Sequence, residues 1–137
     1  MTATDQKEAV RRFMGALESR GSLDVLDEIC TPAIAEEWRA TMEDFAFTDR
    51  TFTVDQIVAE GSQVAILWSI NATHTGEYAH LAPTGKHTSN TGSGFFTFEE
   101  GRIADVVSHY DADGLYDQLG AAVRPADSPG TRPPAGV

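Results

Sequence analysis

The sequence predicts an α+β fold, a cone-shaped barrel in which three N-terminal helices wrap a strongly bent antiparallel sheet. Two observations carry this prediction. Apolar residues recur at helical spacing as far as Phe45, and they then follow a two-residue period from Phe52 to Tyr110. Helices followed by consecutive strands are typical of α+β folds rather than of a wound parallel sheet. A bent sheet of this kind would enclose a cone, and its mouth would form an apolar pocket.

Two amphipathic helices are expected first. Thr4 can cap the first helix, and the pair Gly21-Ser22 ends it. Its apolar face consists of Val10, Phe13, Met14 and Leu17. Ser22 is the expected cap of the second, shorter helix. The second helix would turn Leu23, Leu26 and Ile29 inward.

A third helix is expected from Thr31-Pro32, where a capping hydroxyl precedes proline at the first helical position. Its apolar face consists of Ala35, Trp38, Met42 and Phe45. We expect the pair Asp49-Arg50 to end this helix, so that the first strand starts at Phe52.

Four strands are expected next, over residues 52–60, 63–75, 87–98 and 103–110. In the second strand, one face consists of Val64, Ile66, Trp68 and Ile70. The pair Gly92 and Gly94 predicts a bulge or a sharp bend in the third strand. The turn 99–102 joins the last two strands as a hairpin, and Gly101 supplies its positive φ. A short helix over residues 114–119 follows, with Gly120 as its C-terminal cap.

Composition bounds the class of protein. A chain of 137 residues with 41% hydrophobic content supports one domain, which we expect over residues 1–123, with a disordered Pro/Gly-rich tail over 124–137. The net charge of −11 makes nucleic acid and anionic membranes poor partners. No apolar run reaches the roughly 20 residues of a membrane span, and the polar start is unlike a signal peptide. The single cysteine, Cys30, fits a reducing, cytoplasmic location.

Several short motifs occur in a fixed order along the chain. They are Thr73-His74-Thr75-Gly76, Pro83-Thr84-Gly85-Lys86, Gly101-Arg102-Ile103, Asp105, Asp111, Gly114-Leu115 and Gln118-Leu119-Gly120. Over roughly residues 5–120, their order and spacing resemble the SnoaL-like polyketide cyclases of the nuclear transport factor 2-like superfamily. The resemblance implies the same cone-shaped architecture and a small-molecule pocket.

Asp111 is the principal candidate for acid/base catalysis. An acid at the mouth of an apolar cone has its charged form disfavoured, so it can donate as well as accept a proton. The alternative is that Asp111 only caps the last helix. Asp105 and His109 share a face with Asp111 on a two-residue period, and they could assist if that face points inward. If it points outward, the pocket is lined instead by Ala104, Val106, Ser108 and Tyr110.

Six further residues are candidates for substrate binding. Trp38, Trp68 and Phe96 would form an aromatic wall that suits a flat polycyclic ligand. The polar candidates are His74, Ser108 and Tyr110. Family cyclases often carry a His-Trp-Asp-like stretch where this chain has 106–108, Val-Val-Ser, which removes one acid. The four histidines lack metal-ligand spacing and have no cysteine partners, so we expect neither a metal nor a cofactor.

Three functions fit these features. The first is a cofactor-free cyclase that closes an aromatic polyketide-like substrate by an intramolecular aldol reaction. The second is a cofactor-independent hydroxylase or epoxide-opening enzyme that uses the same pocket. The third is a non-catalytic, dimeric module that binds a small ligand. Aromatic residues left on the outer face of the sheet would need cover, so a homodimer is expected.

Overall fold

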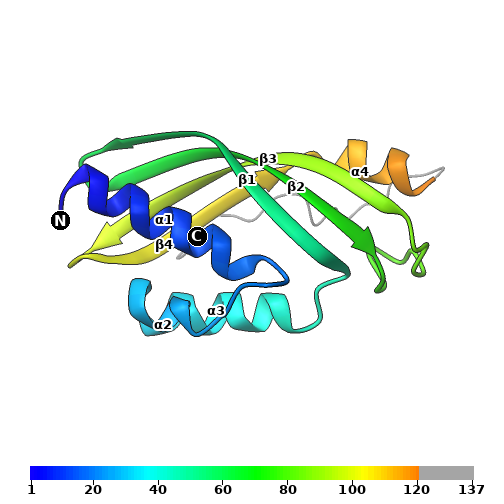
Figure 1. Ribbon diagram of the computed structural model, residues 1–137, viewed down its shortest axis with the longest axis horizontal. Helices are drawn as coiled ribbons and strands as arrows, with labels where there is room; N and C mark the ends of the chain where they lie inside the picture. Colours follow the sequence, from blue (N-terminus) through cyan, green and yellow to red (C-terminus); the bar gives the residue numbers. More distant parts are fainter. Residues whose placement is uncertain (121–137) are drawn as a thin grey trace.

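The computed structural model describes residues 1–120, so the predicted tail and the domain boundary at residue 123 lie outside the described residues. Four antiparallel strands form one curved, unclosed sheet in the order β1-β2-β3-β4, and α1, α2 and α3 lie together on one side of it (Figure 1). The elements are α1 (Ala3–Leu17), α2 (Val25–Ile29), α3 (Pro32–Glu43), β1 (Phe47–Glu60), β2 (Gln63–His74), β3 (His87–Glu99), β4 (Arg102–Tyr110) and α4 (Ala112–Leu119). The predicted α+β class with three N-terminal helices is confirmed.

The helix starts follow from capping chemistry. Thr2 caps α1, because its hydroxyl accepts from the Asp5 N–H while the Asp5 carboxylate accepts from the Thr2 N–H. The predicted cap Thr4 is wrong, since it lies inside the helix. The second helix starts at Val25 after Asp24, rather than directly after Ser22. Thr31 caps α3 as predicted, with proline at its first position.

The predicted end of the third helix is wrong. The helix ends at Glu43, and β1 begins at Phe47 instead of Phe52. Phe47 pairs with His74 of β2, and the Ala46 carbonyl accepts from the N–H of Gly76. Pairing with a distant strand therefore overrides the local helical pattern of this segment.

The sheet has two distinct faces. We call the face that packs against α1–α3 the inner face and the opposite one the outer face. In β2 the inner face carries the predicted set, of which Val64 and Ile66 are buried and Trp68 and Ile70 are half-buried. Each inner residue pairs with inner residues of the neighbouring strands, so one rung runs from Trp68 through Gly92 to Tyr110.

The β3–β4 hairpin contains a bulge, but not at Gly92 and Gly94, where the sequence predicts a bulge or a sharp bend. Pairing is regular through Gly92 and Gly94, so a bulge there is wrong. The irregularity lies between Thr97 and Phe98, where two residues of β4 stand opposite one of β3. The predicted hairpin is confirmed, and both of its turn residues, Glu100 and Gly101, have positive φ.

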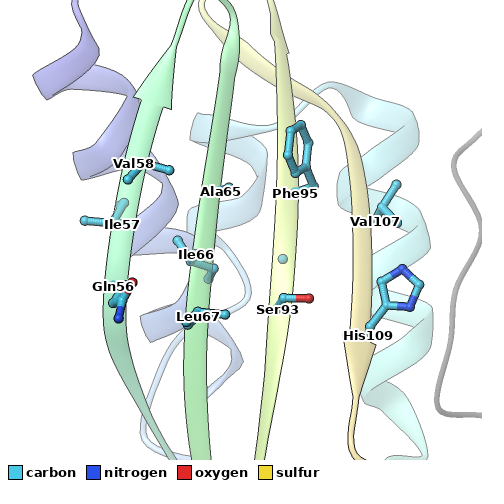
Figure 2. A pocket seen from close by; sticks show the side chains of 11 residues that line it. Gln56, Ile57, Val58, Ala65, Ile66, Leu67, Ser93, Phe95, Val107 and His109 are labelled. Atoms are coloured by element: carbon cyan, nitrogen blue, oxygen red, sulfur yellow. The ribbon is translucent and has the colours of Figure 1, made fainter.

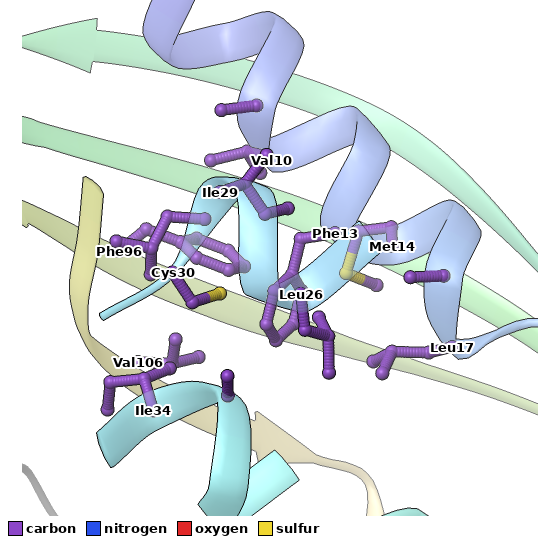
Figure 3. Packing of buried hydrophobic residues seen from close by; sticks show 14 of the residues in the cluster. Val10, Phe13, Met14, Leu17, Leu26, Ile29, Cys30, Ile34, Phe96 and Val106 are labelled. Carbon is purple, nitrogen blue, oxygen red and sulfur yellow. The ribbon is translucent and has the colours of Figure 1, made fainter. Parts of the chain in front are cut away.

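Two buried clusters hold the fold together. The larger lies between α1–α3 and the sheet and includes Phe13, Leu26 and Phe96 (Figure 3). Cys30 belongs to it, and burial raises the pKa of its thiol to about 12, as suits a packed side chain rather than a nucleophile. The smaller cluster lies at the other end of the sheet, where α4 packs beside β3 and contributes Leu115. No helix of residues 1–120 has the length and apolar character needed to cross a membrane.

Candidate functional site

Between the two buried clusters, the inner side of the protein carries aromatic side chains that are only partly covered. We call this set the aromatic wall: Trp38, Phe45, Phe52, Trp68 and Tyr110, all half-buried. Trp38 comes from α3 and the others come from β1, β2, β4 and the α3–β1 connection. Phe45 packs against both clusters, so the wall joins them. Flat rings in this position suit stacking against a planar ligand.

Gly92 positions the ring of Trp68. A Cβ at residue 92 would lie 2.3 Å from Cζ2 of Trp68 and 2.2 Å from the carbonyl oxygen of His109. The indole therefore lies directly against the backbone of β3, where only glycine leaves room for it. The indole also makes an edge contact with Phe52, with the ring centroids 5.8 Å apart.

The predicted wall residue Phe96 lies behind the wall rather than on it. Phe96 is 1% exposed and packs edge-on against Phe13 at 5.2 Å. Phe13 in turn makes an edge contact with Trp38 at 5.3 Å. The side chain of Phe96 therefore supports the position of Trp38 through Phe13, while Trp38 itself is half-buried.

His74 lies at the end of β2 and is fully buried. Its Nδ1 accepts from the N–H of Thr84 at 3.1 Å and lies 2.9 Å from the Thr84 hydroxyl. An acceptor Nδ1 places the ring proton on Nε2. Burial lowers the pKa of His74, and the nearby carbonyl of Gly76 opposes this effect. The ring stacks on Phe47 at 5.2 Å, so this neutral imidazole anchors the turn after β2.

Tyrosine hydroxyls supply the polar end of the wall. The hydroxyls of Tyr78 and Tyr110 lie 2.7 Å apart, and the ring of Tyr116 lies 5.7 Å from that of Tyr78. Burial raises the pKa of Tyr78, and its hydrogen bond with Tyr110 adds to the effect. Sequence reasoning missed Tyr78 and Tyr116. The spacing of Tyr116 between Leu115 and Leu119 indicates an inward position in α4, but no local pattern marks Tyr78 in its loop.

The three predicted acid/base residues do not come together on the inner face. Val106 is buried, and it pairs with Phe96 on the inner face. Asp105 therefore faces outward, and His109 lies on the outer face opposite Ser93. The inner positions of β4 include Ser108 and Tyr110, which is the second of the two alternatives that the sequence left open.

Asp111 follows β4 and is exposed. Its Oδ1 accepts from the N–H of Gly114 at 2.9 Å, and so it caps α4. A Cβ at residue 114 would lie 2.3 Å from Asp111 Oδ2, so glycine makes room for this carboxylate. The backbone N–H of Asp111 donates to the Thr91 carbonyl and fixes the corner between strand and helix.

The outer face carries an open apolar groove that crosses all four strands (Figure 2). Two rows of paired residues line most of it. One row consists of Val58, Ala65, Phe95 and Val107, and the other of Gln56, Leu67, Ser93 and His109. Phe95 is 45% exposed, an unusual position for a phenylalanine ring in a solvated sheet.

Comparison with known proteins identifies the family. The model of the SnoaL-like polyketide cyclases matches residues 8–119. The chain belongs to the SnoaL-like polyketide cyclase family. The motif residues of this SnoaL-like protein have visible structural roles. Arg102 donates to the carbonyls of Asp27 and Cys30 at the end of α2. The side chain of Gln118 accepts from the N–H of Ser89 and donates to its carbonyl, in the part of β3 that β4 does not reach.

Solved structures share the fold of this SnoaL-like protein at low sequence identity. TsrD from Streptomyces laurentii is 22% identical with a TM-score of 0.78, covering 88% of this chain and 98% of TsrD. A candidate SnoaL-like polyketide cyclase from Jannaschia sp. CCS1 is 18% identical with a TM-score of 0.77, covering 89% and 95%. AclR from Streptomyces galilaeus, a candidate hydroxylase, is 20% identical with a TM-score of 0.73, covering 91% of each chain. No curated protein matches the chain.

Within residues 1–120, no group of three or more His, Cys, Asp or Glu side chains is placed to hold a metal ion.

Proposed function

We propose that this protein is a small enzyme of the SnoaL-like cyclase type that acts on an aromatic polyketide-like carbonyl compound. The aromatic wall is the observation that carries the proposal, because its half-buried rings leave flat apolar surface for a planar ligand. The tyrosine hydroxyls at one end of the wall offer neutral donors to carbonyl oxygens. Family membership supports the same class of reaction.

In the proposed reaction, Asp111 removes a proton from the carbon beside a carbonyl. The resulting enolate carbon attacks a second carbonyl of the same molecule, and the new alkoxide takes the proton back from Asp111. No oxidant or cofactor is needed for this balance. The capping bond uses Oδ1 of Asp111, so Oδ2 keeps its lone pairs for proton transfer. Asp105 and His109 lie on the outer face, so we assign them no contact with a ligand on the inner side.

Asp111→Asn tests this role. The asparagine carbonyl can still accept from the Gly114 N–H, so the variant should fold with an unchanged midpoint of unfolding. Turnover of a panel of aromatic poly-β-ketone esters, measured by chromatography, should fall by a factor of about 100 or more because the base is lost. Asp111→Ala is the structural control, and it should lose about 1 kcal/mol of stability with the cap. Turnover that survives in Asp111→Asn would rule out the acid/base role.

A non-catalytic ligand-binding module is the second candidate. It is favoured by the character of the inner positions on β3 and β4, where Asn90, Ser108 and Tyr110 are neutral and no carboxylate or imidazole joins them. A bound polyketide-like ligand recovered unchanged after long incubation would decide for this candidate. A hydroxylase, as AclR is described, would instead place a new oxygen atom in the product, which mass spectrometry would detect.

We also propose that the protein forms a homodimer through the outer face and resides in the cytoplasm. The apolar row of the outer groove, which contains Val58 and Phe95, supports the dimer, because exposed apolar patches of this kind commonly bind another protein surface. The single free cysteine is buried, which is consistent with a reducing compartment.

A further inference from the structure

All three tyrosines of the sequence meet at one end of the aromatic wall. They come from separate elements: Tyr78 from the loop after β2, Tyr110 from the end of β4, and Tyr116 from α4. We call them the tyrosine cluster. The hydroxyls of Tyr78 and Tyr110 are 2.7 Å apart, and that of Tyr116 lies close enough to Tyr78 to affect its pKa but forms no hydrogen bond within ordinary limits.

The Tyr116 hydroxyl is buried without a hydrogen-bond partner in residues 1–120. The Tyr116 side chain is 3% exposed, and its ring lies 5.7 Å from the ring of Tyr78. A buried hydroxyl that leaves water without a partner destabilises the fold, so such groups normally have one. The Tyr116 hydroxyl therefore needs an acceptor oxygen from a bound molecule to complete its hydrogen bonding.

The loop that carries Tyr78 is held in an unusual conformation. Tyr78 and Leu81 exchange two backbone hydrogen bonds, of 3.0 and 2.8 Å, around a two-residue turn. Both turn residues, Ala79 and His80, have positive φ although neither is glycine. Such backbone strain concentrates where a side chain must be presented in one place for function. Here the turn presents Tyr78 to Tyr110 and Tyr116.

We propose that the tyrosine cluster is a binding subsite for one oxygen atom of the ligand, a ketone carbonyl or a phenol, with the Tyr116 hydroxyl donating to it. This inference rests on the proposed function for the flat ring system that the wall would hold, and it adds the group that orients the ring. The Tyr78 hydroxyl stays neutral because burial raises its pKa. Neutral donors in apolar surroundings favour a carbonyl or phenol oxygen over a carboxylate, whose charge would lose its hydration. The same donors would stabilise an enolate oxygen as it forms.

A pair of matched probes tests the subsite. 2-Naphthol and 2-methylnaphthalene share a ring system and differ by a hydroxyl against a methyl group. Dissociation constants for the full chain are measured by NMR chemical-shift titration. We expect the wild-type protein to bind 2-naphthol about tenfold more tightly than 2-methylnaphthalene, as one hydrogen bond to a buried group permits. Tyr116→Phe should bring this ratio close to one and leave the affinity for 2-methylnaphthalene unchanged.

Two controls make the result specific. Phe52→Leu, on the wall but outside the cluster, should weaken both probes alike. Tyr116→Phe removes only an unbonded hydroxyl, so the melting temperature of its ligand-free form should equal or exceed that of the wild type. A lower melting temperature would show that the hydroxyl already has a partner in the free protein, such as a buried water, and would overturn the subsite.

The outcomes separate this subsite from the proposed reaction. An unchanged probe ratio in Tyr116→Phe overturns the subsite and leaves the acid/base role of Asp111 standing. A changed ratio, together with full turnover in Asp111→Asn, supports the subsite and overturns the proposed reaction. Failure of both probes to bind the wild-type protein overturns the subsite and the use of the wall alike.

Discussion

At the scale of single residues, burial decides which ionisable groups change their chemistry. Cys30 and His74 are buried and Tyr78 is half-buried, and in each the pKa moves in the direction that favours the neutral form, mainly because of desolvation. The exposed carboxylate of Asp111 instead has a direct partner in the N–H of Gly114. The charged candidate Asp111 therefore differs from these three groups in lying exposed at the start of α4.

His74 should make stability depend on pH in the mildly acidic range. Its folded-state pKa lies below the ordinary value of 6.5, so between these two values the unfolded chain binds more protons than the folded one. The stabilisation is complete above about pH 6.5 and is lost as the pH falls through the folded-state pKa. Urea unfolding between about pH 7.5 and pH 5 should show the free energy of unfolding decreasing toward low pH.

His74→Asn is the matched variant for this prediction. The asparagine Oδ1 can replace Nδ1 as the acceptor for the Thr84 N–H, while the titrating group is gone. The other three histidines are exposed and remain in the variant, so the difference between the two profiles reports His74 alone. Identical slopes in the two proteins would contradict the lowered pKa.

At the scale of elements, β3 provides the backbone surface on which the Trp68 ring of the aromatic wall lies. Around Gly92 its pairing is regular on both sides and fixes the backbone, and the missing side chain of Gly92 lets Trp68 lie against it. The β3–β4 turn and α4 hold the two ends of β3. The β3–β4 turn closes one end, and Gln118 of α4 satisfies Ser89 at the other, where β4 no longer pairs.

Gly92→Ala should disturb the wall without touching the core. The added methyl group would meet the Trp68 ring and the His109 carbonyl, and relieving that overlap should cost about 1–3 kcal/mol of stability. Tryptophan emission should shift as the Trp68 ring moves toward solvent, and the affinity for 2-naphthol should fall. Chemical denaturation followed by fluorescence measures both effects.

Gly15→Ala is the control for this substitution. Gly15 lies in α1, and a Cβ there would meet nothing within 4 Å. Alanine favours a helix over glycine, so this variant should gain up to about 1 kcal/mol and keep the wild-type emission. A Gly92→Ala protein with unchanged stability and emission would show that the ring has room to move.

At the scale of the whole molecule, the curved sheet has two apolar faces and one set of helices. The inner face is covered by α1–α3 except at the wall, while the outer face of the described chain has no such cover over Leu67 and Phe95. The overall charge of −11 makes self-association through polar surfaces unfavourable, so an apolar patch is the natural place for contact between copies.

Lysine on the outer face should therefore prevent the proposed dimer. Wild-type protein should show about twice the chain mass of 14.8 kDa by light scattering. Phe95→Lys should show the mass of one chain, because a buried, unpaired charge strongly disfavours the interface. Thr53→Lys, an exposed change in the polar part of the same face, should leave the dimer intact. Wild-type protein that stays at the single-chain mass at high concentration would refute the interface.

The sequence by itself determined the order of the elements, the α+β class and the inner face of β2. Those features depend on local signals: caps such as Thr31-Pro32, the positive φ of Gly101, and the alternation from Val64 to Ile70. Pairing of Phe47 with His74 moved the start of β1, because distant hydrogen bonds outweighed the local pattern.

Only the tertiary structure decided which face of β4 meets the helices and which residues meet at the end of the aromatic wall. Both faces of β4 carry apolar residues, so alternation alone does not tell which face points inward. The bulge near the start of β4 adds one residue, and the residues after it therefore change face, which turns Asp105 and His109 outward. The tyrosine cluster likewise unites Tyr78, Tyr110 and Tyr116 from three separate elements. Contacts between distant segments depend on how whole elements pack, and no local spacing encodes them.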